Sequence, residues 1–238
     1  MISQDVLIAL ATKYQTTDTN VRREYFQHLF LSYFYQQPKS ENILFKGGTA
    51  LRILYSSPRF SEDLDFNSSF THYKDIETLL LKTLSQMEKE AIRFTLNEGK
   101  PTTGGYIASF AFYGFPRPVE LRIEISQREK EKNGNVVAIA NDFTPPYNVI
   151  SVPEKKLVME KIKALLARKK PRDFYDVYFI LRKQIHIADK KSLMHVSKLL
   201  QKTTINFEAE LKQFLPRSHW AIIRNFKTNL RRELERSL

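Results

Sequence analysis

Apolar residues in the first half of the chain recur with two different spacings. Between Val21 and Phe34 they return every three or four positions, which predicts an amphipathic helix with Thr17 or Asp18 as its N-cap. Further helices are predicted at 50–55 and 75–91. Shorter apolar runs, several of them alternating, predict strands at 42–45, 63–66, 92–96, 106–113 and 119–126. This mixture predicts an α/β (α+β) fold class with a mixed sheet.

The pattern changes after Pro153, where the apolar spacing is helical throughout. One amphipathic helix is predicted around 157–166, and Pro171 starts another. Weaker helical patterns occupy 190–202, 206–214 and 218–236. The last part of the chain is therefore expected to be a helical C-terminal domain.

Charge divides the chain at nearly the same place. Residues 1–150 carry 17 basic and 17 acidic side chains, whereas 151–238 carry 21 and 9, which accounts for the whole formal net charge of +12. With the prolines in 145–153 as the expected hinge, we predict an α/β domain at 1–150 and a basic helical domain at 151–238. The basic domain could bind a polyanion such as RNA, DNA or nucleotide phosphates, although a solvated helical surface would carry the same charge.

Composition narrows the class of protein. The chain has 238 residues, 42% hydrophobic and 27% charged, which is enough to fold around a core. Cysteine is absent, which excludes a disulfide scaffold, thiolate metal sites and cysteine catalysis. No apolar run reaches the roughly 20 residues that span a bilayer, and the N-terminal segment lacks the basic start of a secretory signal. We therefore expect a cytoplasmic protein that does not contact the membrane.

Two carboxylates, two positions apart, mark the first candidate site. In a strand at 63–66, Asp63 and Asp65 project from one face while Leu64 and Phe66 pack on the other. Adjacent carboxylates repel one another unless a cation lies between them, and a site made only of oxygen ligands suits Mg²⁺. We therefore predict that this pair binds metal.

Glycines before the short helix supply a complementary feature. Gly47 and Gly48 would let backbone amides approach a phosphate closely, and Thr49 stands where a helix N-terminus favours an anion. Together with the paired carboxylates, they predict a site for a nucleoside triphosphate with magnesium. A third carboxylate is expected on the polar face of the strand at 119–126, with Glu124 favoured and Glu120 as the alternative.

Two segments resemble a known family. The first reads Gly-Gly-Thr-Ala-Leu from Gly47, followed by Arg-Phe-Ser-Glu-Asp-Leu-Asp-Phe from Arg59. The second reads Glu-Lys-Ile-Lys-Ala-Leu-Leu-Ala-Arg-Lys-Lys-Pro-Arg-Asp-Phe-Tyr-Asp from Glu160. In sequence, order and spacing they resemble the AbiEii/AbiGii-type nucleotidyltransferase toxins, which include the MenT toxins and belong to the DNA polymerase β-like nucleotidyltransferase superfamily. The resemblance implies a polymerase β-like core followed by helices.

By this resemblance, the first segment would supply the ligands for metal and phosphate. Asp63 and Asp65 would hold two Mg²⁺ ions, with a nucleoside triphosphate as the substrate. Gly48 and Thr49 would contact the triphosphate. The superfamily more often has serine after the second glycine, and threonine keeps the hydroxyl group.

The second segment would add charged groups from the helical domain. Lys161 would reach the nucleotide phosphates, and its place beside an apolar stripe would let it extend into a cleft. Asp176 would match the family's essential late aspartate, with Asp173 beside it, although acids early in a helix also stabilise the helix N-terminus. Arg168 and Arg172 would place positive charge near the leaving pyrophosphate or the RNA.

These features together predict a magnesium-dependent nucleotidyltransferase that moves a nucleoside monophosphate to an acceptor hydroxyl. The basic domain suits an RNA acceptor, and the resemblance implies the 3′ end of tRNA and a toxin with a cognate antitoxin protein. One alternative is transfer to a small molecule such as an aminoglycoside, but such cationic substrates fit a basic protein poorly. Another is a non-catalytic RNA-binding module, against which the intact Asp63, Asp65, Lys161 and Asp176 argue.

Overall fold

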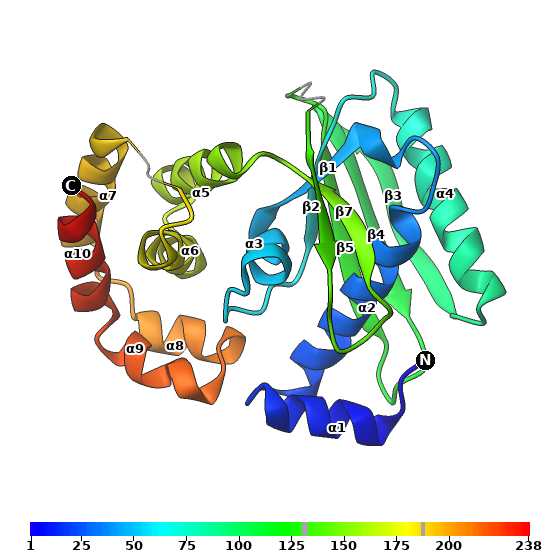
Figure 1. Ribbon diagram of the computed structural model, residues 1–238, viewed down its shortest axis with the longest axis horizontal. Coiled ribbons are helices and arrows are strands. Elements are labelled where there is room, and N and C mark those ends of the chain that lie inside the picture. The colour runs from blue at the N-terminus through cyan, green and yellow to red at the C-terminus, as the bar shows by residue number, and fades with distance from the viewer. Residues whose placement is uncertain (130–132, 187–188) are drawn as a thin grey trace. The chain divides into compact units, whose positions relative to one another are not determined.

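The structure is a computed structural model that describes residues 1–129, 133–186 and 189–238. The chain forms two compact units (Figure 1). The first comprises Met1–Ser56 and Phe60–Val152, and the second comprises Ser57–Arg59 and Pro153–Leu238. Ser57–Arg59 therefore belongs to the second unit, although the residues before and after it belong to the first.

A seven-stranded sheet organises the first unit. Its strands are β1 (Ile43–Lys46), β2 (Leu64–Ser68), β3 (Phe94–Thr102), β4 (Gly105–Phe112), β5 (Val119–Ser126), β6 (Asn135–Ile139) and β7 (Tyr147–Ser151). The order across the sheet is β3-β4-β5-β2-β1-β7-β6. The β2–β5 and β1–β7 pairs are parallel and the other neighbours are antiparallel. This mixed sheet, followed by helices, confirms the predicted fold class.

The helices of the first unit cover both sides of the sheet. They are α1 (Gln4–Lys13), α2 (Asp18–Phe34), a 3₁₀ turn at Ser40–Asn42, α3 (Gly47–Tyr55) and α4 (Tyr73–Lys89). Figure 1 shows α2 and α4 on one side of the sheet and α3 on the other. Thr17 caps α2, since its side chain accepts a hydrogen bond from the Asn20 backbone N–H at 3.3 Å.

The core of the first unit lies between α2 and one face of the sheet. Phe66 of β2 is opposite Ile125 of β5 in register, and both are buried. The ring of Phe34 in α2 lies 5.4 Å from that of Phe66. Because side chains alternate along a strand, neighbours of Phe66 and Ile125 in sequence point to the face away from α2.

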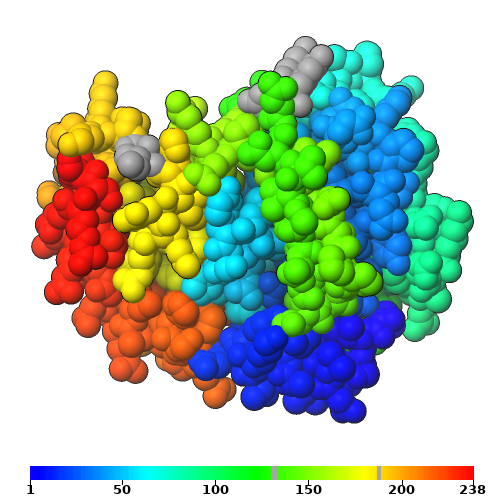
Figure 2. Space-filling view, viewed as in Figure 1, coloured from blue at the N-terminus to red at the C-terminus, as the bar shows by residue number. Residues whose placement is uncertain are grey.

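The hairpin of β6 and β7 is absent from the sequence prediction. The prolines of 145–153 indicate a hinge, whereas Tyr147–Ser151 is a strand that pairs with β1 and β6. That interpretation is wrong for Tyr147–Ser151, because the pairing of this segment with β1 and β6 is long-range and has no local signal in the sequence. The hairpin lies against α1 in the space-filling view (Figure 2). Lys13 of α1 forms an ion pair at 2.5 Å with Asp142, which lies between β6 and β7.

The second unit is helical. Its helices are α5 (Glu154–Arg168), α6 (Pro171–Lys183), α7 (Lys190–Lys202), α8 (Phe207–Leu211), α9 (Trp220–Arg224) and α10 (Phe226–Ser237), with 3₁₀ turns at Lys212–Phe214 and Arg217–His219. Tyr175 stacks on Phe226, with ring centroids 5.9 Å apart, in the core of this unit. The helix expected at 218–236 is divided, because Asn225 has φ −112° and ψ 30°. No helix among the described residues is long and apolar enough to cross a bilayer.

Candidate active site

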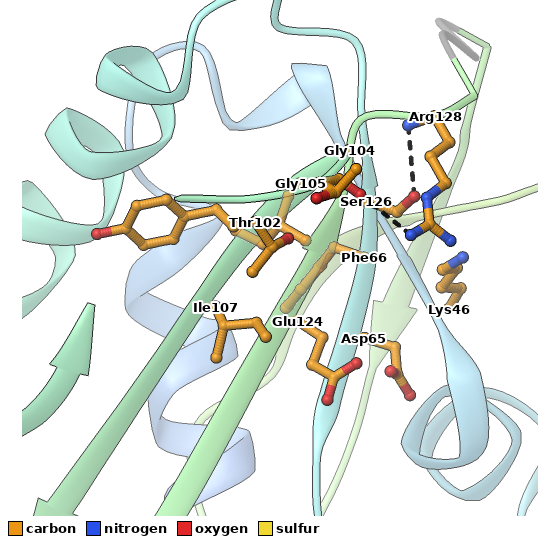
Figure 3. Close-up of a pocket in the computed structure, with 13 residues that line it drawn as sticks. Lys46, Asp65, Phe66, Thr102, Gly104, Gly105, Ile107, Glu124, Ser126 and Arg128 are labelled. Carbon is orange, nitrogen blue, oxygen red and sulfur yellow. Dashed lines mark hydrogen bonds between the residues drawn. The ribbon is translucent and has the colours of Figure 1, made fainter. Parts of the chain in front are cut away.

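A row of four side chains crosses the face of the sheet away from α2. Lys46 of β1 is opposite Asp65 of β2, Asp65 is opposite Glu124 of β5, and Glu124 is opposite Ile107 of β4. Register partners on neighbouring strands project from the same face. Two carboxylates that are distant in sequence are therefore neighbours, and Figure 3 shows both directed to the same side.

Gly47 brings the backbone into contact with one of these carboxylates. Its φ is +85°, which favours glycine. A Cβ atom at this position would lie 2.0 Å from Asp65 Oδ2 and 2.6 Å from Asp65 Cβ. Only a residue without a side chain leaves room for the Asp65 carboxylate here. The glycine predicted for phosphate contact thus also shapes the space that Asp65 occupies.

The beginning of α3 also positions the residue before β2. Thr49 is fully buried, and its hydroxyl donates a hydrogen bond to the backbone carbonyl of Asp63. Asp63 itself precedes β2, which begins at Leu64. The predicted strand therefore starts one residue later than expected, and Asp63 is held by this hydrogen bond rather than by a sheet ladder.

The N-terminus of α3 has the features of an anion site. Lys46 occupies the N-cap and makes no side-chain capping hydrogen bond to the helix. The first backbone N–H groups of a helix have no partner within the helix, and its dipole favours negative charge there. Gly47 and the buried Gly48 keep this end of the helix free of bulky side chains. It is therefore suited to accept phosphate oxygens beside the Asp65 carboxylate.

Asp65 and Glu124 have the chemistry of a site for a divalent cation. Like charges directly opposite on neighbouring strands destabilise a sheet, and a cation between them relieves the repulsion. Glu124 pairs with Arg122 at 2.9 Å, but both side chains are 47% exposed, so this ion pair is weak and exchangeable. Among the described residues there is no ready cluster of three or more acidic or histidine ligands. The oxygen donors present nevertheless fit Mg²⁺.

A cavity of about 440 Å³ opens beside the two carboxylates (Figure 3). It is lined by Asp65 and Glu124 together with residues from the ends of β3, β4 and β5. Lys46 and Arg128 contribute positive charge to the same lining. The site therefore combines carboxylates with cations, as binding of a metal-complexed phosphate requires.

In the second unit, a buried carboxylate is held by two cations. Arg59 donates to Asp176 through Nε at 2.7 Å and Nη2 at 3.0 Å, and Lys161 donates through Nζ at 2.8 Å. All three residues are less than 10% exposed. Burial raises the pKa of Asp176, but the charges and hydrogen bonds of Arg59 and Lys161 outweigh burial and lower it to about 2. Asp176 is therefore ionised at neutral pH.

A second ion pair joins the same two helices. Arg168 Nη2 donates to Asp173 Oδ1 at 2.6 Å, with the arginine half exposed and the aspartate buried. Asp173 Oδ2 has no hydrogen-bond partner among the described residues. Arg172, beside Asp173 at the start of α6, is partly exposed. The charged residues predicted in this segment thus lie on one helical hairpin, and two of its acids are already paired with bases.

The sequence indicates Asp176 but not its partner Arg59. Arg59 was visible within the first motif, but nothing local shows that it binds Asp176, which lies in another part of the chain. Lys46 and Arg128 were missed as well. Their positions in the sequence could have indicated both residues. Lys46 directly precedes Gly47, and Arg128 follows the strand that carries Glu124.

Comparison with solved structures supports the fold. The chain is similar to MenT4, a nucleotidyltransferase toxin from Mycobacterium tuberculosis H37Rv, with a TM-score of 0.67 at 14% identity, covering 98% of this chain and 89% of that one. It is also similar to JHP933 from Helicobacter pylori, with a TM-score of 0.59 at 20% identity, covering 93% and 95%. None of the curated proteins matches the sequence.

The family is defined by a match along most of the chain. Residues 29–236 match the family described as nucleotidyl transferase AbiEii toxin, type IV toxin–antitoxin system. The matched region includes the sheet with Asp65 and Glu124 and the helical hairpin with Lys161 and Asp176. The chain therefore belongs to the AbiEii family and is a nucleotidyltransferase toxin of a type IV toxin–antitoxin system.

Proposed function

We propose that the protein transfers a nucleoside monophosphate from a nucleoside triphosphate to a hydroxyl group of RNA, at the 3′ end of tRNA, in a magnesium-dependent reaction. The observation that carries this proposal is the alignment of Asp65 with Glu124 beside the Gly47 turn. Oxygen ligands and a glycine-rich helix N-terminus are thereby placed together. This combination suits a triphosphate with its metal ions.

Asp63, Asp65 and Glu124 are the residues that would hold Mg²⁺, with two ions expected. When bound, such ions lower the pKa of the attacking hydroxyl and neutralise charge on the leaving oxygens. The bond formed joins the acceptor oxygen to the α-phosphorus, and the bond broken releases pyrophosphate. Positioning of the two reactants then accounts for much of the acceleration.

The chain's own residues would perform the binding and orientation. Backbone N–H groups at Gly47 and Gly48 would bind phosphate oxygens, while Thr49 would position Asp63 through its carbonyl. In the second unit, Lys161 would contact the nucleotide phosphates, and Asp176 would orient the Lys161 ammonium group. A buried carboxylate that stays ionised is well suited to hold that lysine in its charged form.

Surface charge favours RNA as the acceptor. Residues 151–238 carry the entire formal net charge of +12. Arg168 and Arg172 lie at the hairpin of α5 and α6 and would add charge near the pyrophosphate or the RNA. Triphosphates and tRNA coexist in the cytoplasm, which we propose as the compartment, and a cognate antitoxin protein would restrain the activity. A cationic aminoglycoside would be repelled by the same charge.

A transfer assay tests the proposal directly. The protein is incubated with Mg²⁺, total tRNA and each labelled nucleoside triphosphate in turn. We expect label in RNA with the wild type and at least a hundredfold less with Asp63→Asn or Asp65→Asn, since both would lose a metal ligand. A folded wild-type protein that labels RNA with none of the triphosphates would contradict the proposal.

The third carboxylate is tested by a matched pair of variants on one strand. Glu124→Gln should reduce transfer about as strongly as the aspartate variants, because Glu124 is the register partner of Asp65. Glu120→Gln makes the same chemical change at the far end of β5 and should leave transfer within about twofold of wild type. If only Glu120→Gln lost activity, Glu120 and not Glu124 would be the third carboxylate.

A further inference from the structure

The cavity beside the carboxylates extends to one side of them. Its far walls are the C-terminal end of β5 and the turn between β3 and β4, residues 102–105. Gly47 and the start of α3 follow β1, on the opposite side of β2 in the strand order. The volume of about 440 Å³ is within the range of roughly 300–1,000 Å³ that is typical of small-ligand sites. The cavity is large enough for one nucleotide.

The lining of the far part has the chemistry of a phosphate site. Arg128 supplies positive charge, and Ser126, Thr102 and Thr103 add hydroxyl groups. A guanidinium carries five N–H donors in a planar fork that matches two phosphate oxygens. The hydrogen bond that its guanidinium donates goes to the backbone carbonyl of Thr103, a neutral group that does not cancel its positive charge. Its charge is therefore available to an anion.

Arg128 is held in place before any ligand binds. Its Nη2 donates to the carbonyl oxygen of Thr103 at 3.1 Å, and its backbone N–H donates to Ser126 Oγ at 3.4 Å (Figure 3). The side chain also lies on Gly104, where a Cβ atom would be 2.9 Å from its Cγ and Nε. These contacts restrict the exposed side chain, so it loses less entropy on binding a phosphate than an unrestrained arginine would.

The in-line geometry of the reaction indicates which phosphate group Arg128 would bind. In an in-line displacement the attacking hydroxyl and the leaving pyrophosphate lie on opposite sides of the α-phosphorus. If the glycines at the start of α3 hold the pyrophosphate side, the acceptor approaches from the side of β5 and β4. The phosphodiester next to the acceptor's reacting hydroxyl is then the anion nearest Arg128.

We propose that Arg128, supported by Ser126 and the turn at 102–105, binds the terminal phosphodiester of the nucleic-acid acceptor and so positions its 3′ hydroxyl at the carboxylates. This inference rests on the proposed function and assigns one side of the same site to the acceptor. Arg128 is a positioning residue in this scheme. The other source of the same chemistry is the triphosphate itself, and the experiment separates the two.

Binding is measured by fluorescence anisotropy, without triphosphate, so that no turnover is needed. One probe is a 5′-labelled single-stranded RNA ending in CCA-3′, and the other has an uncharged methylphosphonate as its last linkage. Wild type should bind the uncharged probe about tenfold more weakly, the value of one charge-assisted contact. Arg128→Ala should bind both probes equally and match the weaker wild-type value.

Two further variants control for charge and geometry. Arg117→Ala removes the same charge near the opposite end of β5 and should discriminate between the probes as wild type does. Arg128→Lys keeps the charge but not the fork, and should recover part of the discrimination. Equal loss in Arg117→Ala would show that only total charge matters and would overturn the assignment.

Transfer kinetics identify the source of the phosphate. Arg128→Ala should raise the KM for RNA about tenfold and leave the KM for the triphosphate within about twofold. A raised KM for the triphosphate alone would assign the cavity to the nucleotide and overturn the proposal, as would no change in either constant. A wild type that transfers nothing, yet discriminates between the probes through Arg128, would contradict the proposed function and leave the phosphodiester site standing.

Discussion

At residue scale, a single methyl group at Gly47 would collide with the candidate site. A Cβ atom would meet Asp65 Oδ2 at 2.0 Å, on a backbone with φ +85°. We expect Gly47→Ala to displace the Asp65 carboxylate and reduce transfer about a hundredfold or more, because small displacements of reacting groups have effects of that size. Steady-state transfer and the thermal midpoint of unfolding would be measured together.

Gly114 provides the control for this prediction. It also has a positive φ, +125°, but its added Cβ would meet the flexible end of the Met1 side chain. Gly114→Ala should therefore show similar backbone strain and keep its activity. If both variants lose stability and activity in parallel, the effect of Gly47→Ala is one of folding and not of Asp65 placement.

Asp176 should make the free energy of unfolding depend on pH in the acidic range. Its pKa is lowered from 3.8 to about 2, so the folded protein holds this carboxylate ionised where the unfolded chain begins to protonate it. The stabilisation is complete above pH about 4 and is lost as the pH falls through about 2. Its size is about 2 kcal/mol, from the pKa difference.

Urea unfolding across this pH range checks the prediction. The difference in unfolding free energy between wild type and Asp176→Asn should shrink as the pH falls from about 4 to about 2, because the wild-type side chain then becomes neutral as well. At neutral pH the variant leaves Arg59 and Lys161 buried without their carboxylate, which costs about 3–5 kcal/mol. A constant difference at every pH would contradict the assignment.

At the scale of elements, the hairpin of α5 and α6 turns on two lysines of different conformation. Lys169, at the C-cap of α5, has φ +56°, whereas Lys170, at the N-cap of α6, is extended with φ −79°. Lys169→Gly should stabilise the protein by up to about 1 kcal/mol, because glycine adopts the left-handed conformation without penalty. Lys170→Gly removes the same charge and should be neutral or destabilising. Thermal unfolding of the two variants would separate conformation from charge.

The elements that sequence analysis identified are those with a clear period. The apolar stripe of α2 and the strict alternation of β5 give both elements within a few residues of their observed bounds. Alternation also places Glu124 on the polar face. β6 and β7 were missed because neither has a clear alternation of apolar and polar residues and because Pro145 and Pro146 precede β7. Strand pairing, which makes β7 a partner of β1, has no local signal.

The candidate site was predictable only in part for the same reason. Residue types and spacing indicate Asp63, Asp65 and Gly47, because these lie close together in the sequence. The contacts that define their surroundings are long-range: Asp65 with Glu124, and Asp176 with Arg59. Their pairing depends on the sheet register and the helix packing, which a single sequence does not display.

At the scale of the whole molecule, the uneven charge leads to a prediction about salt. RNA binding should weaken steeply as salt rises, with a log–log slope of about −0.7 for each phosphate contacted on a single strand. Binding of a small cationic aminoglycoside would instead be weak at low salt, where repulsion is strongest. Anisotropy titrations over a range of salt concentrations would distinguish the two acceptors. A slope near zero for RNA would contradict the polyanion prediction.

Because residues 57–59 belong to the second unit, neither unit is a single continuous stretch of the chain. The backbone passes from the first unit to the second and back before it reaches β2, and it crosses again after Val152. A cut at residue 152 would give a helical fragment without Arg59, leaving Asp176 with Lys161 alone. Recombination between relatives meets the same obstacle. If residues 153–238 were replaced by those of a relative, the incoming helices would still have to pair with Arg59 of the recipient chain. Arg59 and Asp176 are therefore expected to vary together across the family.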